Sequence, residues 1–202
     1  MDEESRAPAA DERIRAMVLA GDVGAAATAL LRSLGPEVFG FLRASLGNES
    51  DADEVFASTS ERVWRSLASF RWQCTLRTWT YVVARNEIAR FADGTRRHHA
   101  GRVTPSQLDE VVAMVRTETR SALRTEKRNK LKELRDELPV DDRALLVLRI
   151  DRELEWEEVA RTFLPESCTE EEIKRESARL RKRFQLVKRR LADRARQEGL
   201  LS

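Results

Sequence analysis

The chain has 202 residues, of which 36% are charged and 41% are hydrophobic, with few aromatic residues and little glycine or proline. This composition argues against a sheet protein and favours helices, and the length suits two small domains. The formal net charge is only +2, so any affinity for a polyanion must depend on where the charges lie.

The sequence carries no signal for export, a membrane span, a metal or a cofactor. Its first residues are acidic and polar, and no run approaches the roughly 18 apolar residues of a membrane span. Cys74 and Cys168 match no metal-ligand spacing, so we expect reduced thiols in a cytoplasmic protein. No glycine-rich phosphate loop and no nucleophile elbow is found, which argues against an enzyme.

Hydrophobic periodicity predicts two helices near the start of the chain, after a disordered stretch over residues 1–12. The first helix lies within residues 14–34 and ends at a break made by Gly35 and Pro36. The second helix ends at Gly47, a residue able to adopt a positive φ.

Two more helices complete the first predicted domain, which spans residues 13–92. The third helix begins at Ser50 or Asp51, in a pattern like a capping box, and extends to about residue 68. Thr75 is the expected N-cap of the fourth helix. The apolar stripe of that helix consists of Leu76, Trp79, Val83 and Phe91.

A linker is predicted over residues 93–136. Its first part is polar and contains His98 and His99, which match neither a metal pair nor a catalytic base. A charged helical pattern over residues 108–138 is expected to bridge the two domains.

The second predicted domain, residues 137–202, begins with two short helices. Asp141 or Asp142 can cap the first of them. The second contains Trp156, which we interpret as a core residue, and ends at Pro165.

A long basic helix ends the chain. Thr169 and Glu172 form a capping box at its start. Residues 174–196 contain eleven basic residues against only Glu176 and Asp193. The apolar seam consists of Ile173, Leu180, Phe184, Val187 and Leu191. Two helices separated by a turn, the second of them basic, are typical of a DNA-reading module.

Two stretches resemble a known family. The segment "DADEVFASTSERVWRSLASFRWQCTLRTWTYVVARNEIARF" closely resembles region 2, the core-binding and promoter-melting domain, of bacterial sigma factors of the extracytoplasmic-function group. The segment "LPVDDRALLVLRIDRELEWEEVA" resembles the start of sigma region 4, which reads the minus-thirty-five promoter element by a helix-turn-helix. The stretch "RTFLPESCTEEEIKRESA" stands where the family has a short turn, so the register of DNA contacts stays open by about one helical turn.

The resemblance implies partners and a location. They are core RNA polymerase, through its β and β-prime subunits, promoter DNA, and an anti-sigma factor, with no membrane insertion and no cofactor. The protein would be cytoplasmic and nucleoid-associated when bound to polymerase.

The third predicted helix is the expected polymerase-binding surface. By resemblance it docks on the clamp coiled coil of the largest β-type subunit, and its candidate contacts are Asp53, Glu54, Val55, Phe56, Arg62 and Arg65. The alternative interpretation is an ordinary capped bundle helix.

The stretch from Phe70 to Phe91 is the expected minus-ten DNA interface. Bases of a melted strand stack on aromatic rings, which contributes on the order of 1–3 kcal/mol per base, and arginines attract phosphates. Trp72 and Gln73 are candidates for a base pocket, whereas Trp79 belongs to the core. The full candidate set is Arg71, Trp72, Gln73, Arg77, Arg85, Asn86 and Arg90.

The last helix is the expected minus-thirty-five DNA interface. Arginine can read guanine bidentately and glutamine can read adenine in the same way. The candidate residues are Arg179, Arg181, Lys182, Arg183, Gln185 and Lys188. The alternative is a solvated basic face without a partner.

Two functions thus remain from different classes. The first is a sigma factor that directs promoter recognition, melting and transcription initiation. The second is a helix-turn-helix regulator that binds DNA but not polymerase, and such a regulator has no use for the region 2 block.

Overall fold

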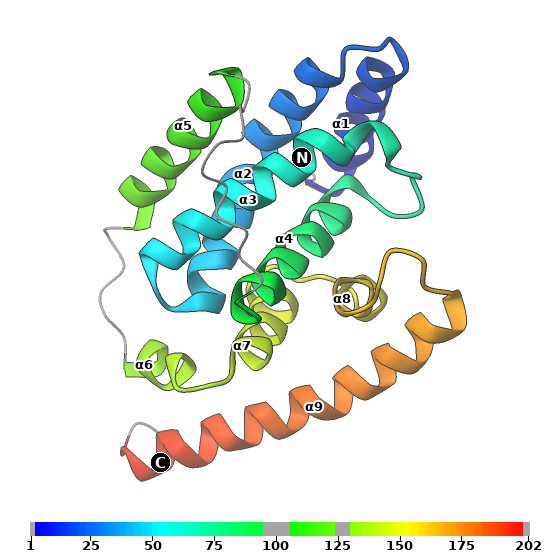
Figure 1. Cartoon of the computed structure of the whole chain (residues 1–202). Helices are drawn as coiled ribbons and strands as arrows, with labels where there is room; N and C mark the ends of the chain where they lie inside the picture. The colour runs from blue at the N-terminus through cyan, green and yellow to red at the C-terminus, as the bar shows by residue number, and fades with distance from the viewer. Residues whose placement is uncertain (1–2, 95–105, 124–129, 200–202) are drawn as a thin grey trace.

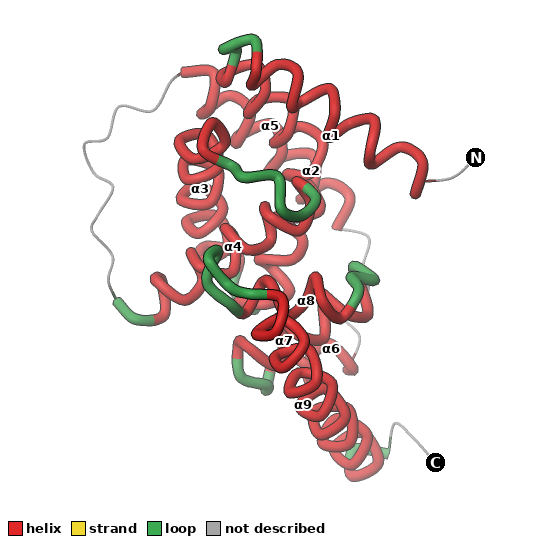
Figure 2. The backbone as a smooth tube through the Cα atoms, turned by 90° about the vertical axis from the view of Figure 1, so that its right-hand side faces the viewer, coloured by secondary structure: helices red, strands yellow, loops and turns green. Residues whose placement is uncertain are grey.

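The computed structural model describes residues 3–94, 106–123 and 130–199, and within these ranges the chain forms helices and no strand (Figures 1 and 2). The predicted all-α fold is therefore confirmed. No helix in these ranges is long and apolar enough to cross a membrane. The elements are α1 (Glu3–Leu19), α2 (Val23–Leu46), α3 (Glu49–Ser66), the 3-10 turn η1 (Leu67–Ser69), α4 (Leu76–Ala92), α5 (Ser106–Leu123), α6 (Lys130–Asp136), α7 (Val140–Leu146), the π-turn η2 (Val147–Asp151), α8 (Trp156–Phe163) and α9 (Glu170–Gln197).

Helix α1 begins at Glu3, where composition predicts disorder. A contact distant in sequence accounts for order in the middle of this helix, because the Asp11 carboxylate accepts a hydrogen bond from the backbone N–H of Leu76 over 2.9 Å. Leu76 is the first residue of α4, so Asp11 satisfies one of the unpaired N–H groups of that helix start. Composition alone cannot show this contact.

Helix α2 is unbroken, so the predicted break at Gly35 and Pro36 is wrong. Pro36 removes one backbone hydrogen bond from the helix, yet Gly35 allows α5 to approach closely. A Cβ atom at Gly35 would lie 2.9 Å from a methyl carbon of Val115. Packing against α5 thus keeps the helix continuous where the local sequence favours a stop.

Polar or glycine residues mark the ends and starts of helices α2 to α4. Gly47 ends α2 with a φ of 73°, as predicted, but α3 is capped by Asn48 rather than by Asp51. The Asn48 side chain accepts a hydrogen bond from the N–H of Ser50 over 2.8 Å. Thr75 caps α4 as predicted.

Helix α5 does not bridge the two domains, contrary to the prediction for residues 108–138. It packs against α2 and α3, and its apolar residues Leu108, Val111, Val112 and Val115 are buried there. We call α1 to α5 the N-terminal lobe and α6 to α9 the C-terminal lobe. His98 and His99 lie outside the described residues.

The C-terminal lobe is organised by α9, which lies along one edge of the molecule (Figure 1). The predicted capping box of Thr169 and Glu172 is present at its start. Phe184 from the apolar seam packs edge-on against Trp156 of α8, with ring centroids 5.4 Å apart. Trp156 is half-buried rather than fully enclosed.

The two lobes pack directly on each other. Helix α4 contacts α8, and α2 contacts α7 and η2. The buried apolar side chains of both lobes form one continuous cluster, which includes Phe41 and Tyr81 on one side and Leu145 and Leu148 on the other. The closed arrangement therefore rests on apolar packing as well as on polar contacts.

Candidate polymerase and DNA interface

Helix α3 presents a charged outer face. Glu54 is exposed, and the half-exposed side chains of Arg62 and Arg65 lie on the same helix. Arg65 pairs with Glu61 over 2.6 Å, and Arg62 lies 3.5 Å from Glu87 of α4. This face offers both signs of charge to a partner.

Three other predicted docking residues lie elsewhere. Val55 and Phe56 are each only 1% exposed, so their placement on the docking surface is wrong. They belong to the core, where Phe56 packs on Phe39 with ring centroids 5.2 Å apart. Asp53 is half-buried beneath α5, and Arg116 donates a hydrogen bond to its backbone carbonyl. The docking face is therefore narrower than its sequence suggests.

The loop between η1 and α4 holds an unusual backbone conformation. Trp72 has a φ of 57°, a left-handed conformation that costs a non-glycine residue about 1–3 kcal/mol. Its ring packs on Phe70 at 4.9 Å, and the guanidinium of Arg15 lies 5.3 Å from its centroid. These contacts hold the strained turn, while Arg71 and Gln73 on either side of Trp72 are exposed.

Helix α4 places its predicted DNA-binding arginines at the boundary between the lobes. Arg77 donates to the Glu37 carboxylate of α2 and, over 2.9 Å, to the backbone carbonyl of Arg152. Arg85 donates to Asp141 of α7 over 2.8 Å and lies 4.5 Å from the centroid of the Phe163 ring. Burial, opposed by the nearby Asp141 carboxylate, lowers the pKa of Arg85.

The remaining α4 candidates lie further along the helix. Asn86 is half-buried, and Arg90 is exposed and pairs with Glu87. As predicted, Trp79 and Val83 are core residues, with 4% and 3% exposure.

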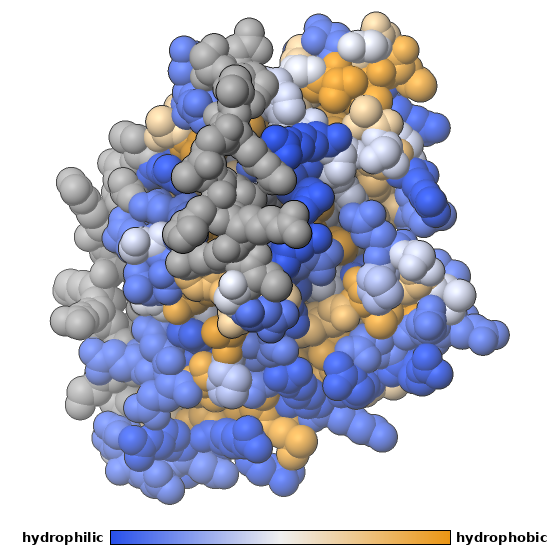
Figure 3. All heavy atoms as spheres, in the orientation of Figure 1, coloured by the Kyte–Doolittle hydropathy of each residue, from blue (hydrophilic) through white to orange (hydrophobic). Residues whose placement is uncertain are grey.

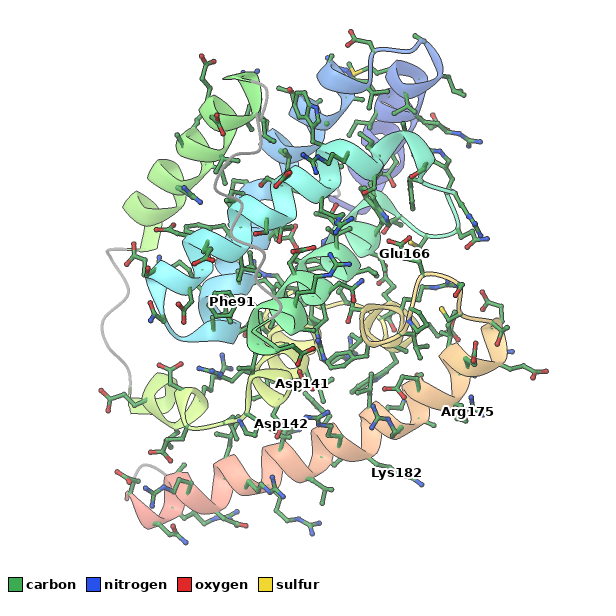
Figure 4. The ribbon with its side chains drawn as sticks, in the orientation of Figure 1. Phe91, Asp141, Asp142, Glu166, Arg175 and Lys182 are labelled. Carbon is green, nitrogen blue, oxygen red and sulfur yellow. The ribbon has the colours of Figure 1, made fainter. Side chains whose placement is uncertain are left out.

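A cavity of about 390 Å³ lies between the lobes. Its lining includes Arg71, Gln73 and Cys74 from the loop before α4, and Glu166 and Cys168 from the loop before α9. Figure 4 shows Glu166 on the side of its loop that faces the N-terminal lobe. Both cysteines are free thiols, and burial raises the pKa of Cys74 to about 11.

Helix α9 carries the basic face. Most of the predicted residues are exposed, and Figure 4 shows Lys182 pointing away from α7 and α8. Figure 3 shows hydrophilic side chains along α9 at the lower edge of the molecule. The exposed predicted residues are Arg179, Arg181, Lys182, Gln185 and Lys188.

Arg183 differs from the other predicted α9 residues. Its guanidinium donates to the Asp142 carboxylate of α7 over 2.6 Å, and the Asp142 side chain is 5% exposed. This side chain therefore faces the lobe and is not available to DNA in this structure.

The stretch that departs from the family pattern has a simple structure. It comprises the end of α8, a loop over residues 164–169, and the first turns of α9. Lys174 and Arg175 are exposed in those first turns; they belong to the predicted basic stretch but not to the predicted set of minus-thirty-five contacts. The capping box at Thr169 was the signal that the helix already begins there.

Comparison with known families concerns the N-terminal lobe. Residues 30–98 match the family model described as Sigma-70 region 2. The match shows that this segment, which is less than half of the chain, is similar to Sigma-70 region 2. A search of curated proteins returned no match. The matched residues include part of α2 together with α3, η1 and α4, the elements that carry the charged face of α3 and the loop of Trp72.

Proposed function

We propose that this chain is a sigma factor of the extracytoplasmic-function group, which binds core RNA polymerase and directs promoter recognition, melting and initiation. The observation that carries the proposal is the region 2 match over the helices that present the loop of Trp72. A rigid, strained loop with exposed polar neighbours, next to a charged helix face, suits a domain that holds polymerase and a melted strand together.

Polymerase docking is assigned to the outer face of α3. Glu54, Arg62 and Arg65 are the predicted residues that remain accessible there. Their mixed charges complement a charged coiled coil, and the β-prime clamp is such a surface by family resemblance.

Minus-ten recognition is assigned to the loop before α4. Gln73 and Arg71 are exposed, so their side chains can meet a base edge and a phosphate once the strand has opened. Trp72 supports the loop through Phe70 and Arg15, and its remaining exposed surface is available for stacking.

Minus-thirty-five recognition is assigned to α8 and α9 as a helix-turn-helix. In this motif the N-terminal residues of the second helix contact base edges in the major groove. That geometry favours Lys174, Arg175 and Arg179 as groove residues, with Arg181, Lys182 and Gln185 further along.

The proposal includes no catalysis and no cofactor, and it places the protein in the cytoplasm, on the nucleoid when bound to polymerase. Family resemblance adds an anti-sigma factor as a partner.

The competing function is a helix-turn-helix regulator that does not bind polymerase. Co-purification of the chain with core RNA polymerase separates the two. The Glu54→Lys/Arg62→Glu chain should lose this association, because losing an anchor residue typically costs 1–4 kcal/mol of binding. The matched control is Glu12→Lys/Arg32→Glu, which reverses two exposed charges on α1 and α2 and keeps the same net charge. Equal binding by the two variants would remove α3 as the docking surface.

A further inference from the structure

Helix α1 lies outside the segment that is similar to Sigma-70 region 2, which begins at residue 30. One face of α1 consists of Asp11, Ile14, Arg15 and Val18, because residues three and four apart are neighbours on a helix. Ile14 is buried, and Val18 packs against the core, so this face lies on the N-terminal lobe. In Figure 1, α1 (dark blue) and the loop between η1 and α4 (turquoise) lie at the same end of that lobe.

Asp11 acts on the start of α4, directly after this loop. Its carboxylate accepts the hydrogen bond from the backbone N–H of Leu76, while the Thr75 side chain accepts one from the N–H of Thr78 over 3.1 Å. Two of the N–H groups that a helix start leaves unpaired are thus satisfied by side chains, and one of these side chains comes from α1. Burial raises the pKa of Asp11, although the bond from Leu76 opposes the shift. The half-buried carboxylate therefore ties α1 to the far end of the loop.

Arg15 acts on the middle of the loop. The rings of Trp79, Phe70 and Trp72 follow one another, with 4.9 Å between the centroids of each neighbouring pair. Trp79 is a core residue, so this row of rings leads from the core outwards to Trp72. The exposed Arg15 then places its guanidinium 5.3 Å from the Trp72 centroid, within the range of a cation–π contact. Helix α1 thus closes the row of rings at its outer end.

The backbone of the loop requires such support. Trp72 has a φ of 57°, and a non-glycine residue keeps a left-handed conformation only where its surroundings determine it strongly. The exposed side chains of Arg71 and Gln73 adjoin Trp72 in the chain, so their positions follow from this backbone conformation. Loss of the contacts from α1 would leave the strained turn to Phe70 and the cap of Thr75.

We propose that α1 belongs to the minus-ten interface, with Asp11 and Arg15 as positioning residues that hold Arg71 and Gln73 where a melted strand can reach them. The proposal rests on the function proposed above and deepens it. Removing the contacts from α1 should impair strand opening and leave polymerase binding intact, because the docking face lies on α3.

The test variants are Asp11→Ala and Arg15→Leu, each of which removes one contact with the loop. The matched controls are Glu12→Ala and Arg13→Leu, which remove the same charges from exposed positions of the same helix. Asp11→Asn keeps an oxygen that can accept from Leu76, and Arg15→Lys keeps a cation near the Trp72 ring. These two conservative variants should therefore retain most of the wild-type behaviour.

The first measurement reports the loop in the free full-length chain. Fluorine NMR of the chain labelled with fluorotryptophan gives a resonance for Trp72, which Trp72→Phe assigns. Asp11 bonds to Leu76 and not to the ring, so a shifted or broadened Trp72 resonance in Asp11→Ala reports a change of the whole loop. The resonance of Trp156, in the C-terminal lobe, should stay unchanged, and the controls should alter neither.

The second measurement separates opening from binding. Core polymerase is incubated with pooled genomic fragments and each chain, and its affinity for each chain is measured in parallel. The double variant Asp11→Ala/Arg15→Leu should lower transcript yield and the permanganate reactivity of unpaired thymines about tenfold, because it loses both a hydrogen bond and a cation–π contact. Its affinity for core polymerase should equal that of the double control Glu12→Ala/Arg13→Leu.

Three results would overturn the proposal. They are a Trp72 resonance that Asp11→Ala leaves unchanged, strand opening by the double variant at the rate of its control, and a loss of polymerase binding that parallels the loss of opening. The last result would show that α1 supports the whole domain rather than the loop. Failure of the function proposed above looks different, because the wild-type chain itself would then give no start site, while the fluorine spectra would still decide whether α1 holds the loop.

Discussion

Arg183 of α9 and Asp142 of α7 form a close ion pair, with 2.6 Å between the guanidinium nitrogen and a carboxylate oxygen. The carboxylate is almost fully buried, whereas the arginine side chain keeps about 29% of its exposure. This pair fixes the angle at which the basic helix lies on the C-terminal lobe. It therefore aligns the face that we assign to the minus-thirty-five element.

Asp142→Ala should destabilise the chain by about 1–3 kcal/mol. Removing one member of a buried pair leaves the other without its partner, and the partial exposure of Arg183 reduces the full penalty. Urea unfolding followed by circular dichroism measures the change. Asp193→Ala is the control, because Asp193 pairs with Arg196 at an exposed position. A loss no greater than that of the control would show that the pair is not structural.

Gln73→Ala should slow strand opening and leave closed-complex formation nearly intact. The partner of Gln73 exists only after a base has left the stack, so the substitution affects a later step. Permanganate reactivity of unpaired thymines reports the opening rate. Ser69→Ala, an exposed position at the end of η1, is the control. Identical opening kinetics in the two variants would return the loop to a structural role.

Substitutions along α9 should separate base reading from phosphate attraction. Truncating a residue that reads a base should cost about 1–3 kcal/mol at one base pair, whereas losing a phosphate contact should weaken all sequences and reduce the log–log salt slope by about one. Lys174, Arg175 and Gln185 are the sharpest positions, with Arg196→Ala at the far end of the helix as control. If none of these substitutions altered the preference for the minus-thirty-five sequence, the helix-turn-helix assignment would be wrong.

The thiol of Cys74 should react slowly with iodoacetamide at pH 8. Burial raises its pKa to about 11, so the group stays protonated, and the rate should rise about tenfold per pH unit until pH approaches 11. Rates are measured on the Cys168→Ser chain, with the urea-unfolded chain as reference. If the reaction rate of Cys74 depended on pH in the folded chain as it does in the unfolded chain, the thiol would not be buried.

Local signals in the sequence predict local structure well. Gly47, Thr75 and the capping box of Thr169 and Glu172 lie where the helices end or begin, because each of these residues satisfies backbone groups of its own helix. The predicted break at Gly35 is wrong for the opposite reason, because a contact that is not local decides there: the helix is kept continuous by packing against Val115, 80 residues away.

The site depends more on contacts that join distant parts of the chain. Arg85 meets Asp141 only after the lobes pack, and neither residue has a pattern that predicts its partner. Phe56 was assigned to the docking surface because the charges around it resemble a family surface, yet its own apolar side chain is in the core. Helical periodicity predicts on which face of its helix a residue lies. Tertiary packing determines which other element covers that face.

In vitro transcription with purified core RNA polymerase measures whether this chain acts as a sigma factor. Core enzyme lacking any sigma factor is incubated with a library of genomic fragments, with and without this chain, and the 5′ ends of the transcripts are mapped. We expect the chain to direct initiation at defined start sites that share minus-ten and minus-thirty-five elements, and we expect Glu54→Lys/Arg62→Glu to abolish this initiation. Fragments bound by the chain without any defined start site would contradict this expectation and identify a DNA-binding regulator instead.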